Sequence, residues 1–153
     1  MKNIVIASAL AFASTIAVAA PVGVDTTVSY RNDKAVQQEG VEANVSYSVM
    51  PELVVGATVF ADSDDLVSYG AHVGSPVKIK STNIVVTPYI GYERYDEAKV
   101  SSLNAGVKAF APVFAKNTGV TADVKVIEAV GENRDSLDQG DDYSFSIGLT
   151  QKF

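Results

Sequence analysis

The sequence predicts an all-β fold, an eight-stranded antiparallel up-and-down transmembrane β-barrel. Three observations lead to this prediction: an N-terminal export signal, eight segments in which apolar and polar residues alternate, and a last segment that ends on an aromatic residue, Phe153. Alternation with a period of two gives a strand one apolar face and one polar face. Strands can cross a membrane only as a closed barrel, because lipid offers no partner to an unpaired backbone group. Eight is the smallest common number of strands in such a barrel.

The first 19 residues have the features of a secretory signal peptide. A short basic start precedes an apolar stretch at residues 4–13, and Ala17 and Ala19 form a small-residue cleavage site. The apolar stretch is too short to cross a bilayer as a helix. We therefore expect a signal peptide at residues 1–19 and one domain, the barrel, at residues 20–153. Because the chain contains no cysteine, neither a lipid-modified cysteine nor a disulfide can hold this domain.

Eight alternating segments cover most of the remaining chain. They lie at residues 22–31, 40–49, 52–61, 66–74, 83–94, 99–110 and 119–130, and the eighth ends at Phe153. Their lengths match the about 9–11 residues that a tilted strand needs to cross a bilayer. Pro88 lies inside the fifth segment. Because proline has no N–H to donate, it predicts a bulge or a missing hydrogen bond at this point.

The connections differ between the two ends of the predicted strands. If the chain starts in the periplasm, the periplasmic turns lie at residues 50–52, 75–82 and 111–118, which contain Pro51, Pro76 and Pro112 and the lysines Lys78, Lys80 and Lys116. The outward connections lie at residues 32–39, 62–65, 95–98 and 131–142, and they carry most of the aspartates and glutamates. We therefore expect acidic surface loops at the outward end.

Aromatic side chains mark both ends of the apolar faces. We expect one aromatic belt near the outward ends, at Tyr30, Tyr69, Tyr92 and Tyr143, and a second near the periplasmic ends, at Tyr47 and Phe153. Aromatic rings are enriched at the headgroup level of membranes, and they form two girdles in transmembrane barrels. Both belts are therefore predicted to face lipid.

The polar faces carry charged residues that the predicted barrel would enclose. These lumen charges are Glu42, Glu93, Lys108, Asp123 and Lys125. An eight-stranded barrel is only wide enough inside for side chains. Because an unpaired buried charge is costly, we expect at least one lysine–carboxylate pair to plug the lumen. Lys108 and Asp123 form the most plausible pair, since they lie on neighbouring strands.

The end of the chain resembles the assembly signal of outer-membrane barrels. Residues 146–153 pass from polar residues through Gly148 to the closing aromatic Phe153, although Gln151 stands where an apolar residue is usual. The mature chain is also similar in architecture to the small barrels of the OmpA transmembrane-domain and OmpX/Ail/Lom type. This resemblance implies the bacterial outer membrane as location and outer-membrane lipid and lipopolysaccharide as partners. It also implies recognition by the barrel assembly machinery through the C-terminal strand.

Few residues could carry chemistry. His72 is the only histidine, and the sequence after it lacks the His-x-Ser pattern of the deacylase-like outer-membrane enzymes. We expect it to be a hydrogen-bonded lumen residue. Aspartates cluster at residues 62–65 and 135–142; carboxylates are ligands of hard cations, but acidic loops are usually only solvated. We therefore predict no catalytic residue, no cofactor, no metal ligand and no enzymatic activity.

Three functions are compatible with these features. The first is an outer-membrane barrel with a structural or surface-binding role, whose loops contact a surface ligand or phage. The second is a narrow pore, in which Glu42, Lys108, Asp123 and Lys125 line a water path. The third, favoured least, is a soluble periplasmic ligand-binding barrel of the lipocalin type, with its apolar faces inward. The formal net charge of −6 argues against nucleic acid as a partner.

Overall fold

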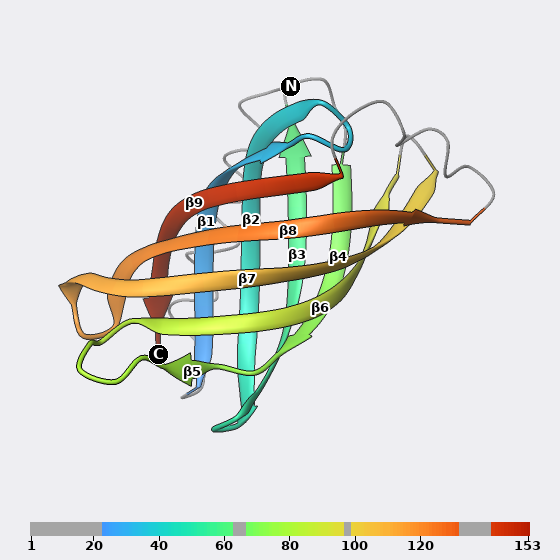
Figure 1. The fold of residues 1–153 in the computed structure, drawn as a ribbon. Helices are drawn as coiled ribbons and strands as arrows, with labels where there is room; N and C mark the ends of the chain where they lie inside the picture. The colour runs from blue at the N-terminus through green and yellow to red at the C-terminus, as the bar shows by residue number, and fades with distance from the viewer. Residues whose placement is uncertain (1–22, 63–66, 97–98, 132–141) are drawn as a thin grey trace.

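A closed β-barrel forms the described part of the chain, which comprises residues 23–62, 67–96, 99–131 and 142–153 of the computed structural model (Figure 1). Its strands are β1 (Val24–Asp33), β2 (Gln38–Met50), β3 (Leu53–Asp62), β4 (Val67–Gly74), β5 (Val77–Lys78), β6 (Val85–Tyr95), β7 (Val100–Ala115), β8 (Thr118–Val130) and β9 (Tyr143–Lys152). These described residues contain no helix long and apolar enough to cross a membrane. The signal peptide predicted at residues 1–19 lies outside them.

The eight long strands form an antiparallel up-and-down barrel, which confirms the fold class predicted from the sequence. Each long strand pairs with the next one along the chain, and β1 pairs with β9 to close the sheet. The two-residue strand β5 pairs with β6. We call the end of the barrel at which Gly23 and Phe153 are hydrogen-bonded the lower rim. The opposite end, which carries the β1–β2 turn, is the upper rim.

The strands are strongly tilted relative to the barrel axis. Starting at Val24 in β1 and moving at each step to the paired residue on the next long strand, one arrives at Tyr143 in β9. The Tyr143 carbonyl accepts a hydrogen bond from Lys34, ten residues beyond Val24. A closed barrel of eight strands needs such a stagger, with strands about 35–45° from the axis. In Figure 1, β6 to β9 in front accordingly cross β1 to β4 behind.

Pro88 interrupts a ladder, as its position in the sequence predicts. β4 and β5 pair with β6 in one continuous register, but Ser75 and Pro76 between them are not part of the ladder. In an antiparallel strand, the N–H and C=O of one residue point to the same neighbour. The Pro88 carbonyl accepts a hydrogen bond from the Ser75 N–H at 3.0 Å, so the missing N–H of Pro88 faces this interruption. A locally missing bond, rather than a bulge in β6, accommodates the proline.

The upper connections begin later than the sequence predicts. Residues 32–39 are predicted to be a loop, but β1 runs to Asp33 and β2 begins at Gln38, so that residues 34–37 form the turn. Asp33 and Asp62 are predicted to lie in acidic loops. Instead, they end β1 and β3 with buried side chains. The reason for Asp33 is its ion pair with Arg31 inside the barrel, which outweighs the turn propensity of aspartate.

Two lower turns also contain more strand than the sequence predicts. Residues 111–118 are predicted to be a turn, but β7 extends to Ala115 and is the longest strand of the barrel. The register against β8 shifts between Pro112 and Ala115, and such an irregularity is where a strand tolerates proline. Residues 75–82 are likewise predicted to be a turn, but they contain β5.

Polar side chains face the lumen, and apolar side chains face outward. Buried polar residues line the inner wall, among them Thr27, Asn44, Ser102, Thr121 and Ser146. Many large apolar side chains are exposed on the outer wall, among them Val59, Ile90, Leu103, Val107, Val124 and Leu149. A soluble protein buries its apolar residues, whereas a transmembrane barrel shows the reverse distribution found here. The outer surface is therefore matched to lipid.

The seam between β1 and β9 depends on the end of the chain. The Phe153 N–H donates a hydrogen bond to the Val24 carbonyl at 2.9 Å, and the Gly23 N–H donates to the Phe153 carbonyl at 2.8 Å. A Cβ atom at Gly148 would lie 2.2 Å from the Val28 carbonyl oxygen, so any other residue there would push β1 and β9 apart. Both residues of the predicted assembly signal therefore contribute to closing the barrel.

Deletion of Phe153 is predicted to reduce barrel assembly more than Phe153→Ser does. The deletion removes backbone hydrogen bonds of the seam together with the aromatic ring, whereas the substitution removes only the ring. The amount of folded, heat-modifiable protein in the outer-membrane fraction measures the difference. Wild-type amounts of the deletion variant would contradict the role of Phe153, and an equal loss in both variants would assign the effect to the ring alone.

Candidate functional site

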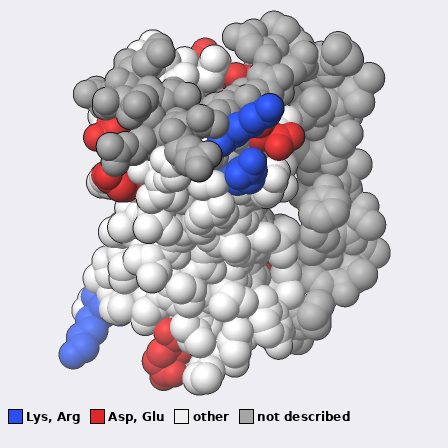
Figure 2. Space-filling view, turned by 90° about the vertical axis from the view of Figure 1, so that its right-hand side faces the viewer, with Lys and Arg blue, Asp and Glu red and all other residues white. Residues whose placement is uncertain are grey.

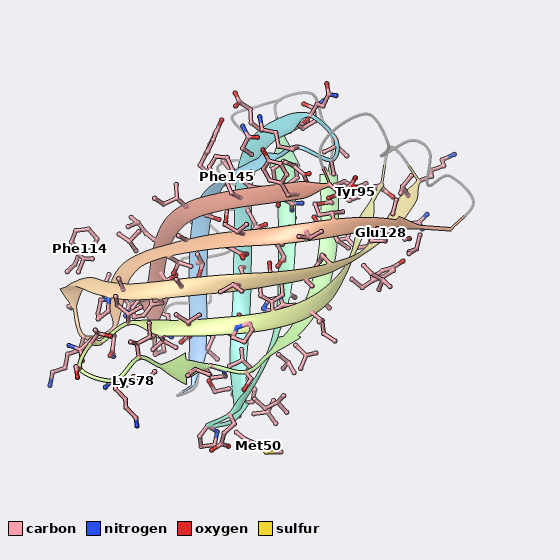
Figure 3. The ribbon with its side chains drawn as sticks, in the orientation of Figure 1. Met50, Lys78, Tyr95, Phe114, Glu128 and Phe145 are labelled. Carbon is pink, nitrogen blue, oxygen red and sulfur yellow. The ribbon has the colours of Figure 1, made fainter. Side chains whose placement is uncertain are left out.

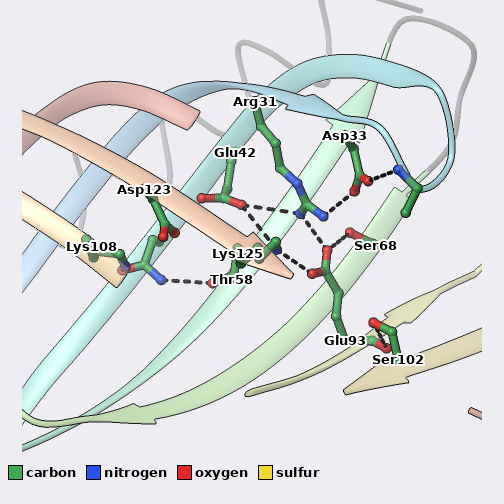
Figure 4. Close-up of polar contacts among 12 residues, drawn as sticks. Arg31, Asp33, Glu42, Thr58, Ser68, Glu93, Ser102, Lys108, Asp123 and Lys125 are labelled. Atoms are coloured by element: carbon green, nitrogen blue, oxygen red, sulfur yellow. Dashed lines mark hydrogen bonds and ion pairs between the residues drawn. The ribbon is translucent and has the colours of Figure 1, made fainter. Parts of the chain in front are cut away.

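The lumen contains a group of paired charges centred on Arg31 (Figure 4). The guanidinium group is fully buried and contacts three carboxylates: Asp33 on the same strand, Glu93 at 2.5 Å and Glu42 at 3.3 Å. Each carboxylate receives one charge-assisted contact from the guanidinium group, and such contacts are about twice as strong as hydrogen bonds between neutral groups. Arg31 lies on β1 and Glu93 on β6, which are opposite strands of the closed sheet. The contacts therefore cross the lumen and join its two walls.

Lys125 extends this group from β8. Its ammonium nitrogen lies 2.6 Å from the nearer Glu93 oxygen and 4.0 Å from Glu42. Glu93 thus bridges Arg31 and Lys125, and it also accepts a hydrogen bond from the Ser68 hydroxyl. We call these five charged residues the charge cluster: Arg31, Asp33, Glu42, Glu93 and Lys125. Its two cations and three carboxylates come from β1, β2, β6 and β8.

An apolar cap lies beside the charge cluster toward the upper rim. Phe60, Tyr95 and Val100 are fully buried and pack together. The Arg31 guanidinium lies 4.6 Å from the centre of the Phe60 ring, a cation–π distance. The Tyr95 hydroxyl accepts from Arg31 at 3.0 Å and donates to Asp33 at 2.8 Å. The cap removes the upper side of the charge cluster from water and strengthens its electrostatic contacts.

The ion pair predicted between Lys108 and Asp123 is not formed. The two described residues face each other in the β7–β8 register, but each has another partner. The Tyr89 hydroxyl donates to the Asp123 carboxylate at 2.9 Å, and Lys108 donates to the Asn44 amide oxygen at 3.2 Å. Tyr89 explains why the predicted pair is absent. Its hydroxyl is hydrogen-bonded to the Asp123 carboxylate, and the centre of its ring lies 5.8 Å from the Lys108 ammonium nitrogen. The ion pairs of the lumen lie in the charge cluster instead.

Hydroxyl groups and one further ion pair fill the lower half of the lumen. The Thr150 hydroxyl lies 2.7 Å from that of Thr27 and 2.5 Å from that of Thr121. Lys152 forms an ion pair with Asp25 at 2.6 Å, and its ammonium lies 4.6 Å from the centre of the buried Phe110 ring. These contacts bring β1, β7, β8 and β9 together near the lower rim.

His72 lies in the lumen at a long hydrogen-bond distance from Ser46. Its Nε2 atom is 3.4 Å from the Ser46 hydroxyl, which donates instead to the Asn44 amide oxygen at 2.8 Å. A base that activates a nucleophile typically lies about 2.6–3.2 Å from it. Among the described residues, no group of three or more acidic, histidine or cysteine side chains is arranged to hold a metal ion. The predicted loop aspartates at positions 64, 65, 135, 138 and 141 lie outside those residues.

The described lumen is packed rather than open. Its lower half holds a space of about 80 Å³ bordered by His72, Tyr89 and Lys108. A second space of about 20 Å³ lies between Glu42, Glu93 and Lys125 in the upper half. Since about 10–15 Å³ of such space is enough for one water molecule, the larger space has room for several waters and the smaller one for a single water. The charge cluster and the tyrosines occupy the rest of the cross-section.

The predicted belt residues lie on the outer surface. Tyr30, Tyr69, Tyr92 and Tyr143 are exposed on the outer face toward the upper rim, Tyr47 is exposed near the lower rim, and Phe153 is half-buried there. Figure 2 shows one face of the barrel, on which charged side chains lie near the top and at the bottom and a broad uncharged zone separates them. Arg94 and Glu128 point outward near the upper rim. A zone with this order of charged, uncharged and charged groups fits a bilayer.

Sequence reasoning did not single out four important lumen residues. Alternation places Arg31 and Tyr89 on the polar face of their strands together with predicted lumen residues, but it does not show which partners they contact. Asp33 and Tyr95 were hidden because the predicted strands ended too early. Nothing in the pattern marks Arg31 as the centre of the charge cluster, since that role depends on which strand lies opposite β1.

The fold is shared with known transmembrane barrels. No protein-family model and no curated protein matches the sequence. Among solved structures, the N-terminal β-barrel domain of Pseudomonas aeruginosa OprF is 8% identical, with a TM-score of 0.57 over 85% of this chain and 96% of that chain. The Yersinia pestis outer membrane protein Ail is 12% identical, with a TM-score of 0.56 over 87% and 100%. A de novo designed transmembrane β-barrel is 15% identical, with a TM-score of 0.62 over 87% and 98%.

These similarities concern the fold. They confirm the architecture predicted from the sequence, that of the small eight-stranded barrels of the OmpA and OmpX/Ail type. At identities of 8–15% they transfer no site residue. The function of this chain therefore depends on its own lumen, surfaces and rims.

Arg31→Met is predicted to lower the free energy of unfolding by about 3–5 kcal/mol, because it leaves three buried carboxylates with one cation between them. Lys108→Met should lower it by about 1–2 kcal/mol, since it removes one lumen hydrogen bond. Urea unfolding of the barrel in phospholipid vesicles, followed by tyrosine fluorescence, gives both values.

Two further variants serve as controls for this prediction. Arg94→Met removes an outward-facing arginine near the upper rim and should have little effect. The double variant Arg31→Met with Glu93→Gln should be more stable than Arg31→Met alone, because it removes one of the uncompensated charges. If Arg31→Met and Lys108→Met unfold at the same urea concentration, the charge cluster is not the main support of the lumen.

Proposed function

We propose that this protein is exported by the signal peptide at residues 1–19 and spans the bacterial outer membrane as a closed barrel with a structural or surface-binding role. One observation carries the proposal: paired charges lie inside the barrel, while large apolar side chains such as Ile90, Leu103 and Val124 are exposed on its outer wall. A soluble lipocalin-like barrel needs an apolar ligand cavity inside and a polar surface outside. The distribution in this chain supports the membrane alternative.

The packing of the lumen favours an anchor over a pore. The charge cluster crosses the barrel from β1 to β6, and two spaces bordered by described lumen residues have volumes of about 80 and 20 Å³. An ion path through an eight-stranded barrel would require these side chains to separate, which would leave buried charges unpaired. In the proposed role, the strands hold the protein in the membrane and the upper loops provide its contact surface.

The same packing argues against an enzymatic role. The space inside the lumen that borders both His72 and Ser46 is about 80 Å³, which is small for a lipid or peptide substrate, and the two side chains lie at a long hydrogen-bond distance. Proposed partners are outer-membrane lipid and lipopolysaccharide along the outer wall, and the barrel assembly machinery through β9. A surface ligand or phage would bind at the upper rim. We propose no nucleic-acid partner, no cofactor and no metal.

Cell fractionation combined with gel mobility tests the proposed location. We expect the protein in the outer-membrane fraction, with different mobility before and after boiling, because a closed barrel resists detergent until it is heated. A protein recovered in the soluble periplasmic fraction would support the lipocalin-like alternative and contradict the proposal.

Ala105→Arg is predicted to lower the free energy of unfolding by about 2–4 kcal/mol in vesicles, the cost of placing arginine on the lipid face of a barrel near the midplane. Ala105 is exposed on the outer face of β7. On a soluble barrel, the same exposed substitution would change stability by less than about 0.5 kcal/mol. Ala105→Leu is the matched control and should be neutral. A neutral Ala105→Arg would show that this face contacts water.

A further inference from the structure

The lower rim between β5 and the β7–β8 turn has a chemistry that barrel closure does not require. At the end of β7, Val113 and Phe114 are 62% and 67% exposed, and Phe114 has the highest value among the exposed large hydrophobic residues of the described chain. Figure 3 shows Phe114 pointing away from the barrel at the end of β7 and Lys78 pointing outward below it, near β5. An apolar tip with this exposure needs an apolar environment, and a lipid leaflet provides one.

A pocket of about 580 Å³ lies between these segments. Its border includes Lys78 on β5, Lys116 in the β7–β8 turn, Lys152 on β9, and the apolar residues Val113 and Phe114. Basic and apolar groups therefore meet in one hollow at the rim. We call this hollow the basic rim pocket.

The lysines at this rim outnumber the carboxylates. Lys152 is paired with Asp25, but Lys78, Lys80 and Lys116 are exposed and have no carboxylate partner among the described residues. Glu52, the other acidic residue of this rim, lies in the β2–β3 turn. The pocket therefore carries uncompensated positive charge, whereas the chain as a whole has a net charge of −6.

We propose that the basic rim pocket binds an anionic phospholipid of the leaflet at the lower rim. Its phosphate lies beside Lys78 and Lys116, and its acyl chains lie against Val113 and Phe114. Lysine ammonium groups bind phosphate as point charges, and aromatic side chains locate at the headgroup level. A soluble anion would use the lysines but would gain nothing from the apolar tip, so the combination selects an amphiphile.

This inference rests on the proposed function, because the lower rim must lie at a membrane surface. It adds a ligand class and a place on the barrel. A lysine near an anionic leaflet is attracted to the anionic lipids. This attraction increases the equilibrium constant for lipid binding about fivefold per lysine. We therefore expect a local enrichment of anionic lipid of about fivefold or more at the pocket.

A single tryptophan makes the enrichment measurable. The chain contains no tryptophan, so Phe114→Trp places one fluorescent reporter at the pocket. The variant is reconstituted in phosphatidylcholine vesicles that contain a minority of brominated phosphatidylglycerol or the same amount of brominated phosphatidylcholine. We expect brominated phosphatidylglycerol to quench as strongly as an about fivefold higher concentration of brominated phosphatidylcholine.

Two control substitutions separate the pocket from general charge effects. Adding Lys78→Gln and Lys116→Gln to Phe114→Trp should abolish the preference. Adding Lys99→Gln, which removes an exposed lysine at the upper rim, should leave it unchanged. Tyr47→Trp in the otherwise unchanged chain, a reporter near the lower rim on β2, should show no preference. Each variant is first checked for heat-modifiable gel mobility, so that a folding defect is not mistaken for lost binding.

The outcomes decide the proposal. Equal quenching by both brominated lipids at position 114, or an equal preference at position 47, would overturn the pocket. A preference that survives loss of both lysines but not loss of Lys99 would also overturn it. Free inorganic phosphate that removes the preference at low concentration would show an anion site rather than a lipid site. If neither brominated lipid quenches, the barrel is not in the bilayer and the proposed function itself fails.

Discussion

Closure of the sheet by the pairing of β1 with β9 is the constraint on which the rest of this structure depends. An open sheet of eight strands would leave two edges of unpaired peptide groups, and in lipid each such group costs several kcal/mol. The pairing that starts at Val24 returns to β1 at Lys34, ten residues further along this strand. This stagger and the number of strands together set the tilt of the strands and the width of the lumen. A lumen this narrow has to be filled by side chains. Backbone hydrogen bonding at the seam therefore determines which side chains meet inside.

The charge cluster is the main consequence of closure inside the barrel. Burying ions is expensive, and a buried salt bridge is by itself weak support for stability. Arg31 reaches carboxylates on β1, β2 and β6 because tilt and register bring opposite walls to one level. We interpret the cluster as a device for specificity, since a register shift of one residue would turn these groups toward the lipid. The apolar cap of Phe60, Tyr95 and Val100 completes this arrangement at the upper side.

Alternation of residues was sufficient to predict the fold class, because a period of two needs no knowledge of distant contacts. Alternation correctly predicts which face of β2 lies inside the barrel, the face with Glu42 and Asn44. Strand ends were predicted less well. Aspartate favours turns, but the ion pair with Arg31 keeps Asp33 in β1. Pro112 lies in β7 because the register against β8 shifts beside it. Pairing across the lumen was not predictable from neighbouring strands alone. Lys108 and Asp123 are adjacent in register, but Tyr89 from β6 takes the Asp123 carboxylate.

The central claim is that the outer wall of this barrel contacts lipid while its charges lie inside. The chain contains no cysteine, so single spin labels can be placed on the exposed outer face of β8 through Ala122→Cys, Val124→Cys and Val126→Cys in separate variants. Electron paramagnetic resonance then compares collisions with oxygen, which is enriched in lipid, and with a water-soluble nickel complex. If the outer wall contacts lipid, we expect high oxygen and low nickel accessibility at all three positions in vesicles. High nickel accessibility at these positions would place the outer wall in water instead of lipid.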